Sequence, residues 1–215
     1  LGGLGPNLGD AHEIVYAGIG RAEGRVIDLH VRNTTEYYVA HPDRNGKDQG
    51  EFGNINLLQD RKTYFEFCFK DQADGAYSAL DSFYLTFYDL DRSDSFDFEE
   101  IIFSNASEWG AEAQLSPNTE IVRRDGDAGP EDEWVAFEST TVGIGEDNPT
   151  DPDDVTEQQR NRAVTFYFSN RACVNFGLAS IVPGSYPGHT RCCVLAERGA
   201  PLRCCDLAVQ AEPKP

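Results

Sequence analysis

Two carboxylates, Asp89 and Asp91, directly follow an alternating apolar and polar stretch that begins at Ser82. Alternation with a period of two predicts a strand with one buried face, so both carboxylates should stand on one side of the strand end. Ca²⁺ binds about six to eight oxygen ligands and favours carboxylates. The sequence therefore predicts one structural calcium ion, with ligands drawn from Asp89, Asp91, Asp94, Asp97 and Glu99.

The spacing of these acids departs from that of an EF-hand loop. The invariant glycine of such a loop is missing, and no helices flank the segment. An acidic turn is the alternative, in which the side chains accept hydrogen bonds from backbone N–H groups. In the sequence alone both interpretations stay open.

Six cysteines form a second constellation. Cys192-Cys193 and Cys204-Cys205 flank a segment whose centre, Arg198–Pro201, is typical of a turn. Folding back at this turn would bring the two vicinal pairs opposite each other, while the other two cysteines fall in predicted strands. The predicted disulfides are Cys192–Cys205, Cys193–Cys204 and Cys68–Cys173.

A zinc site with four cysteine ligands is the alternative for the C-terminal cysteines. The usual Cys-x₂-Cys spacing is absent, however, and the side chains of adjacent strand residues point apart. An even number of cysteines suits an oxidising compartment and favours disulfides. Connectivity among the four clustered cysteines is left open.

Catalytic motifs are not evident. The histidines are scattered, and Ser82 and Ser104 lack the glycines of a nucleophile elbow. We expect the protein not to be an enzyme, and only carboxylate pairs for glycoside hydrolysis stay open, because the separation that matters there is spatial. Exposed aromatic rings near acids and calcium would suit carbohydrate recognition, with burial in the core as the alternative. The candidate rings are Trp109, Trp134, Tyr37 and Tyr38.

Charge and composition exclude several classes of partner. The 215 residues include 37 acidic and 18 basic ones, for a net charge of −19. Such a chain repels nucleic-acid phosphates and anionic lipid, and it favours cations and basic partners. No run of about 18 apolar residues predicts a transmembrane segment. The absence of methionine predicts a mature form whose targeting segment has been removed.

Short strands and polar loops dominate the chain, and 13 Phe with 9 Tyr suit pleated surfaces. We predict an all-β protein, an antiparallel β-sandwich of jelly-roll type with a disulfide-stapled C-terminal tail. The expected organisation is an extended arm over residues 1–12, a sandwich over 13–182 and a Cys-rich extension over 183–215. Asn33-Thr-Thr and Asn105-Ala-Ser are glycosylation sequons compatible with secretion.

Individual elements can be placed more closely. The strand after Ser82 should be central, with Phe96–Ser104 as its neighbour and Arg171–Ser180 as the last core strand. Val155–Arg162 predicts a short helix, with Asp153 and Asp154 as its N-cap. The glycine pairs Gly18-Ile-Gly20 and Gly143-Ile-Gly145 predict turns, not phosphate loops.

Three segments carry a resemblance to a family: Phe52-Gly-Asn-Ile-Asn-Leu, Phe83-Tyr-Leu-Thr-Phe-Tyr-Asp-Leu-Asp and Gln159-Arg-Asn-Arg-Ala-Val-Thr-Phe. Over about residues 13–180 the chain resembles a domain of secreted or plastid-associated proteins of dinoflagellates and related algae. The resemblance implies that Asp89 and Asp91 are the family's paired acids and calcium ligands. Here Arg92-Ser93-Asp94 replaces the glycine-rich continuation of that pattern.

Two functions follow as expectations. The first is a non-catalytic accessory subunit of a larger assembly in an oxidising compartment. Given the algal resemblance, its concrete form is a thylakoid-lumenal subunit docked on a photosystem–antenna supercomplex, with protein subunits and a basic electron carrier as partners. The alternative is a free, calcium-dependent carbohydrate-binding module at the cell surface.

Overall fold

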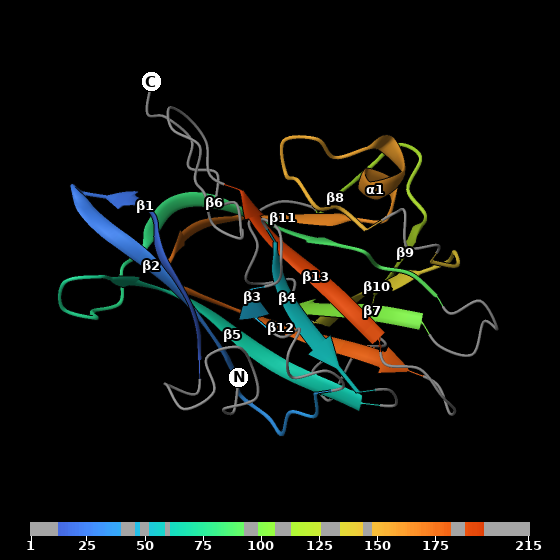
Figure 1. The fold of residues 1–215 in the computed structure, drawn as a ribbon, viewed down its shortest axis with the longest axis horizontal. Coiled ribbons are helices and arrows are strands. Elements are labelled where there is room, and N and C mark those ends of the chain that lie inside the picture. Colours follow the sequence, from blue (N-terminus) through green and yellow to red (C-terminus); the bar gives the residue numbers. More distant parts are fainter. Residues whose placement is uncertain are drawn as a thin grey trace.

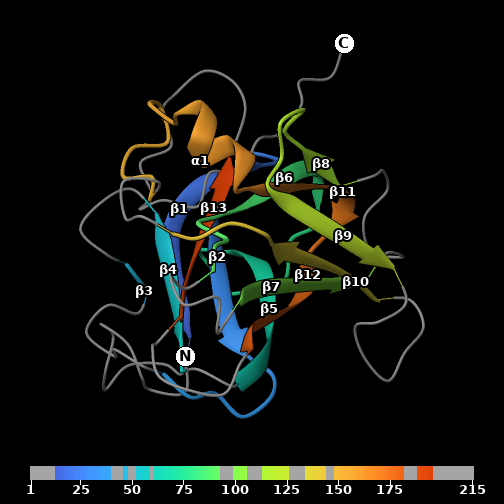
Figure 2. The same cartoon turned by 90° about the vertical axis from the view of Figure 1, so that its right-hand side faces the viewer.

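Residues of alternating polarity form two antiparallel sheets that pack on one another (Figures 1 and 2). The computed structural model describes residues 13–39, 46–47, 52–58, 61–92, 99–105, 113–125, 134–143, 148–181 and 188–195. One sheet has seven strands, in the order β1 (Ile14–Ala22), β2 (Arg25–Asn33), β5 (Arg61–Asp71), β12 (Cys173–Ile181), β7 (Glu99–Asn105), β10 (Trp134–Ser139) and β9 (Ile121–Asp125). The other has six, in the order β3 (Gly46–Lys47), β4 (Gly53–Leu57), β13 (Gly188–Leu195), β6 (Leu80–Tyr88), β11 (Val164–Arg171) and β8 (Gln114–Leu115). The predicted antiparallel β-sandwich is confirmed.

Phenylalanine rings fill the space between the sheets. They stand at alternate positions of the central strands, as a period of two requires. Rings from opposite sheets meet directly: Phe69 and Phe83 lie 4.6 Å apart between centroids, and so do Phe87 and Phe176. Burial of each such side chain stabilises the fold by about 1.5–3 kcal/mol. The fully buried rings are Phe65, Phe67, Phe69, Phe83, Phe87, Phe137, Phe166, Phe168 and Phe176.

β6 is central in its sheet, as predicted, but its neighbours are different from those expected. It pairs with β11 and β13, whereas β7 pairs with β12 and β10 in the other sheet. The expectation that Phe96–Ser104 lies beside the central strand is therefore wrong. The chain changes sheets between β6 and β7, and a local pattern of polarity carries no information about that change.

β13 extends the sandwich beyond the expected end of its core. It lies between β4 and β6, with register pairs from Gly188 and Leu57 to Leu195 and Tyr84. Arg171–Ser180 is therefore not the last core strand, and residues 188–195 belong to the six-stranded sheet and not to a separate extension. Thr190 and Val194, which have high strand propensity, are the local signal for this strand.

Gly18 and Gly20 lie within β1, so the predicted turn at this position is wrong. The register between β1 and β2 shifts between Tyr16 and Gly20, which marks a β-bulge. Gly18 has a φ of 67°, a conformation that glycine adopts without steric cost. Its N–H donates to the buried Asp28 carboxylate at 2.7 Å. The glycine therefore bends an edge strand and satisfies a buried acid.

The helix α1 (Glu157–Asn161) forms where a short helix was predicted, but its cap is different. Thr156 is the N-cap: its hydroxyl accepts from the Gln159 N–H at 3.3 Å, and the Gln159 side chain accepts from the Thr156 N–H at 2.9 Å. This reciprocal capping box replaces the expected Asp153/Asp154 cap. Both views show α1 at one end of the sandwich (Figures 1 and 2). Among the described residues, no helix is long and apolar enough to cross a bilayer.

Candidate functional site

Asp89–Arg92, which we call the crossover, leads from the end of β6 to the opposite sheet. Asp89 has a φ of 63°, so the strand geometry stops there and the expected alternation of Asp89 with Asp91 ends. The buried Leu90 donates its N–H to the Arg162 carbonyl at 3.2 Å. Beyond it, the Asp91 carbonyl accepts from the Ser139 hydroxyl at 2.7 Å, at the end of β10. The crossover therefore ties the two sheets together.

Backbone pairing continues past the acids. The Arg92 N–H donates to the Thr141 carbonyl at 2.8 Å, and the Gly143 N–H donates to the Arg92 carbonyl at 2.9 Å. Arg92 and Val142 form a parallel bridge. Gly143 lies alongside the crossover, and the rest of the turn predicted at Gly143-Ile-Gly145 falls outside the described residues.

Gly143 allows the Asp91 carboxyl group to approach the backbone. A Cβ at position 143 would overlap that carboxyl group, so only glycine fits here without movement of its neighbours. Burial raises the pKa of Asp91 to about 6, although the nearby Arg162 guanidinium acts in the opposite direction. Asp91 is therefore an acid that changes its charge in a mildly acidic medium.

Arg162 supplies the positive charge at this end of the sandwich. It is buried, follows α1 directly and donates its Nε–H to the Glu120 carboxylate at 2.8 Å. The same Glu120 oxygen accepts from the Thr141 hydroxyl at 2.6 Å. Burial opposes ionisation of Glu120, but the hydrogen bonds from Thr141 and Arg162, together with the Arg162 charge, hold its pKa below the ordinary value.

Only some of the calcium ligands predicted from the sequence lie within the described residues. Asp89 is buried and Asp91 partly buried at the crossover, whereas Asp94 and Asp97 lie outside the described residues. Glu99 begins β7, on the opposite sheet from β6, and its side chain is not among the described ones. Within the described residues, the crossover offers two carboxylates with Arg162 close to one of them. That guanidinium already compensates part of the negative charge that a cation would bind.

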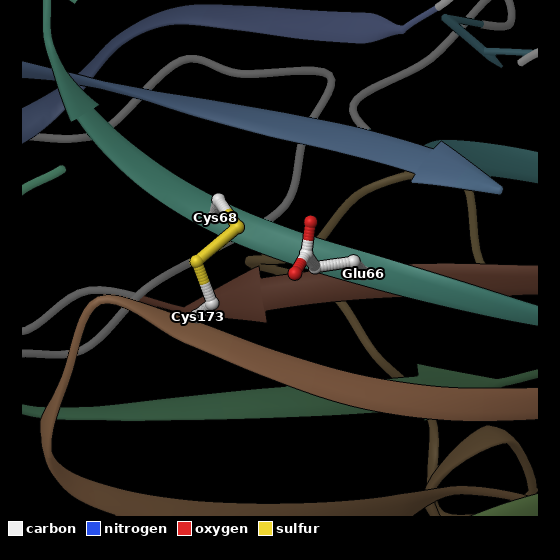
Figure 3. Close-up of side chains that lie close together, drawn as sticks. All are labelled: Glu66, Cys68 and Cys173. Atoms are coloured by element: carbon white, nitrogen blue, oxygen red, sulfur yellow. A yellow bond between two sulfur atoms is a disulfide. The ribbon is translucent and has the colours of Figure 1, made fainter. Parts of the chain in front are cut away.

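The disulfide between Cys68 and Cys173 is present, as predicted. Both cysteines stand directly opposite each other on the neighbouring strands β5 and β12, and Figure 3 shows the S–S bond bridging the two ribbons beside Glu66. Among the described residues, Glu66, Cys68 and Cys173 are the one trio of potential metal ligands within 4.8 Å of one another. Since the two sulfur atoms are bonded to each other, the cysteines form a covalent cross-link, and the trio is not a metal site. A disulfide suits an oxidising compartment.

The C-terminal cysteines are placed in part. Cys192 and Cys193 lie in β13, and their side chains are not described, while Cys204 and Cys205 fall outside the described residues. The predicted pairs Cys192–Cys205 and Cys193–Cys204 thus stay predictions. β4 and β6 occupy both edges of β13. A returning segment would therefore reach these cysteines across a face of the sheet, and not as an adjacent strand.

An ionic cluster on the outer face of the seven-stranded sheet was not found from the sequence. The His30 Nδ1 lies 2.5 Å from a Glu13 carboxylate oxygen, and the Lys70 Nζ lies 3.5 Å from the same oxygen. Arg32 pairs with Glu66 on the same face, two residues further along β2 from His30. Burial opposes ionisation of Glu13, but the His30 hydrogen bond and the Lys70 charge outweigh it and lower the pKa of Glu13. The pairing of β2 with β5, and with β1, which Glu13 directly precedes, assembles this cluster. The pairing of β2 with β5 joins residues far apart in sequence and has no local signal.

The aromatic candidates for carbohydrate contact divide into two kinds. Tyr37 is buried: its hydroxyl donates to the Asn56 carbonyl at 2.6 Å, and its ring meets Phe65 edge-on, so the core alternative holds for Tyr37. Tyr38 is 38% exposed, and the Arg61 guanidinium stands 5.0 Å above its ring. Trp134 starts β10 without a described side chain, and Trp109 lies outside the described residues.

Tyr38 belongs to an exposed rim that we call the tyrosine rim, made of Glu36, Tyr38, Leu58 and Arg61. The Leu58 N–H donates to the Tyr38 carbonyl at 2.9 Å, and the Leu58 side chain is 40% exposed. A hydrogen bond to Glu36 raises the pKa of the Tyr38 hydroxyl. The rim thus combines an exposed ring with a carboxylate and a guanidinium.

Comparisons with known proteins show the fold. No protein-family model matches the chain, and no curated protein matches it. The N-terminal domain of the Streptococcus gordonii adhesin Sgo0707 is similar at a TM-score of 0.51 and 13% identity, over 83% of this chain and 46% of that one. The adhesin domain of PrgB from Enterococcus faecalis matches with a TM-score of 0.43 at 14% identity, over 92% of this chain and 65% of that one. Its DNA-bound form matches with a TM-score of 0.41 at 15% identity, over 80% and 61%.

The chain therefore shares a sandwich fold with an adhesin domain and spans about half the length of that structure. At this level of identity the likeness concerns the fold alone.

Proposed function

We propose that this chain is a non-catalytic accessory module of an oxidising compartment, which acts through the surfaces it presents. The observation that carries the proposal is the cross-linked scaffold itself, because its interior is filled by phenylalanine rings and the Cys68–Cys173 disulfide links two adjacent strands of one sheet. Such a body is suited to holding surface groups in fixed positions. The fold it shares with the Sgo0707 domain supports a place at the cell surface.

The tyrosine rim supports carbohydrate as the ligand of the module. An exposed tyrosine offers an apolar face for a sugar ring together with a hydroxyl at its edge. Arg61, which stands over the Tyr38 ring, and Glu36, which is hydrogen-bonded to the Tyr38 hydroxyl, provide a donor and an acceptor for sugar hydroxyl groups. We propose that this rim is the contact surface.

A structural calcium ion remains part of the proposal. Asp89 and Asp91 would provide two of its oxygen ligands, and the acids at positions 94 and 97 follow closely in the chain. Calcium bound there would neutralise the partly buried Asp91 and hold the crossover in place. Since ligand binding to the folded state alone adds RT ln(1 + [L]/Kd), millimolar Ca²⁺ should raise the unfolding temperature of the wild type. The variant Asp91→Asn should respond less, and an unchanged wild-type unfolding temperature would remove calcium from the proposal.

Binding to a glycan array tests the carbohydrate proposal. We expect reproducible binding that EDTA weakens and that Tyr38→Ala reduces at least tenfold. Tyr77→Ala is the matched control, because Tyr77 is also exposed, at 59%, and also carries a cation over its ring, the Lys70 Nζ at 5.6 Å. Equal losses in both variants, or no binding to any glycan, would contradict the proposed rim.

Fractionation of the source cells tests the location. Recovery at the cell surface supports the proposal as stated. Recovery with thylakoid complexes would instead support a lumenal subunit docked on a photosystem–antenna supercomplex.

A further inference from the structure

The sequon Asn33-Thr34-Thr35 lies where β2 ends and the chain leaves the seven-stranded sheet. Asn33 forms the last register pair of β2, with Phe65 of β5. Asn33 is partly exposed, and Thr34 and Thr35 are exposed. The motif therefore stands at the rim of the sandwich, where a bulky group at Asn33 can extend into solvent.

The contacts of the motif leave room for a covalent group. The Asn33 Nδ2 donates one hydrogen bond, to the Thr35 carbonyl at 2.9 Å. A substituted amide nitrogen keeps one of its two hydrogens, so this bond can persist after modification. The segment is fixed by other groups: the Thr34 N–H donates to the Tyr64 carbonyl at 2.8 Å, and the Thr35 hydroxyl accepts from the Tyr64 N–H at 2.9 Å.

We infer that Asn33 carries an N-linked glycan. The nitrogen of the Asn33 amide attacks the anomeric carbon of a lipid-diphosphate-linked oligosaccharide, the donor supplied along a secretory route. A nitrogen–carbon bond forms, the bond from that carbon to the diphosphate oxygen breaks, and the nitrogen loses one proton as the lipid diphosphate leaves. The inference rests on the cell-surface location proposed above, and the disulfide between Cys68 and Cys173 agrees with such a route.

The second sequon serves as an internal comparison. Asn105 is the last residue of β7 and pairs with Trp134, and residues 106–107 lie outside the described residues. Because the rest of that sequon is not described, the inference concerns Asn33 alone.

Mass spectrometry of the native protein tests the inference. Trypsin should release Asn33 in a peptide of residues 33–44, or of 26–44 if cleavage after Arg32 is blocked. We expect these peptides to carry an N-acetylhexosamine-based glycan, and enzymatic removal of that glycan should convert Asn33 to Asp. An unmodified Asn33 in the native protein would overturn the inference.

Variants secreted from eukaryotic cells give a second readout. Asn33→Gln and Thr35→Ala should each lose one glycan, seen as a shift on a denaturing gel. Thr35→Ser should keep the glycan, because it keeps the hydroxyl of the sequon and the acceptor for the Tyr64 N–H. If Asn33→Gln migrates like the wild type, the inference is overturned.

Failure of the inference can be distinguished from failure of the proposed location. A glycan at Asn105 without one at Asn33 would overturn the inference and keep the secretory route. Recovery at the cell surface with both sites unmodified would also overturn the inference alone. Recovery in the thylakoid lumen with both sites unmodified would overturn both.

Discussion

Two regions of this sandwich connect its strands by different physical means. On the outer face of the seven-stranded sheet, a covalent bond joins β5 to β12 within one sheet. At the crossover, hydrogen bonds and the Arg162–Glu120 pair join one sheet to the other. The covalent link stabilises mainly by restricting the unfolded chain, whereas the crossover depends on contacts and charges of the folded state. Redox conditions should therefore act on the first region, and the larger effect of pH should fall on the second.

Removal of the disulfide should have the largest effect. Cys68 and Cys173 are 105 residues apart, and closing so long a loop restricts the unfolded chain strongly. The double variant Cys68→Ala/Cys173→Ala should lose about 2–5 kcal/mol of unfolding free energy, measured by urea denaturation. The wild type in reducing buffer should approach the variant. If the free energy differs by less than about 0.5 kcal/mol, the link does not act on the unfolded chain as described.

The pH dependence of the crossover should come next in size. The pKa of Asp91 rises from 3.8 to about 6 on folding, so the folded state binds more protons than the unfolded state between these values. The contribution of Asp91 therefore favours folding in acid and declines as the pH rises from about 4 to 6, by up to about 3 kcal/mol.

The variant Asp91→Asn isolates this contribution. Because other acids titrate equally in both proteins, the stability of the variant relative to the wild type should rise between pH 4 and 6 and then level off. Urea denaturation at several pH values measures the difference. A flat difference across this range would show that the charge of Asp91 is not unfavourable in the folded state.

A methyl group at position 143 should disturb the crossover through packing. Because a Cβ there overlaps the Asp91 carboxyl group, Gly143→Ala should lose about 1–3 kcal/mol. The double variant Gly143→Ala/Asp91→Ala removes the overlapping group and should recover part of that loss. Thermal unfolding of the four proteins of this cycle measures the coupling. Additive losses would mean that the two residues do not interact.

The two regions also differ in how far they can be predicted from sequence. The alternation of Phe65, Phe67 and Phe69 marks β5 as a strand, and Cys68 falls on its opposite face, so the covalent link could be proposed from local patterns. The contacts of the crossover could not be proposed from local patterns. Glu120 and Arg162 are far apart in the chain, and the left-handed conformation of Asp89 ends an alternation that otherwise reads as continuous.

Strand pairing accounts for most of the remaining differences. Which sheet receives β7, or where β13 inserts, depends on packing between residues far apart in sequence. One missed feature was local: Thr156 and Gln159 have the spacing of a capping box, and this signal could have corrected the predicted cap of α1.

The smallest expected effect concerns the ionic cluster on the outer face. The pKa of Glu13 lies below its ordinary value in the folded state because His30 and Lys70 favour its charged form. Its stabilisation is therefore present above pH 4.5 and is lost as the pH falls through the lower, folded value. Because the pair is near the surface, Glu13→Gln should cost only about 0.2–1 kcal/mol at neutral pH.

The direction of this effect sharpens the contrast between the two regions. Glu13→Gln should be less stable than the wild type at neutral pH, and this difference should vanish as the pH falls toward 4 and below. Asp91→Asn should gain stability relative to the wild type as the pH rises from 4 to 6, and this gain should shrink as the pH falls from 6 to 4. Salt should reduce the Glu13 effect further, because charges near the surface are screened, and should affect the more deeply placed Asp91 less. Stability curves of both variants at two salt concentrations measure the contrast. Equal salt sensitivity would show that the crossover is as open to solvent as the outer face.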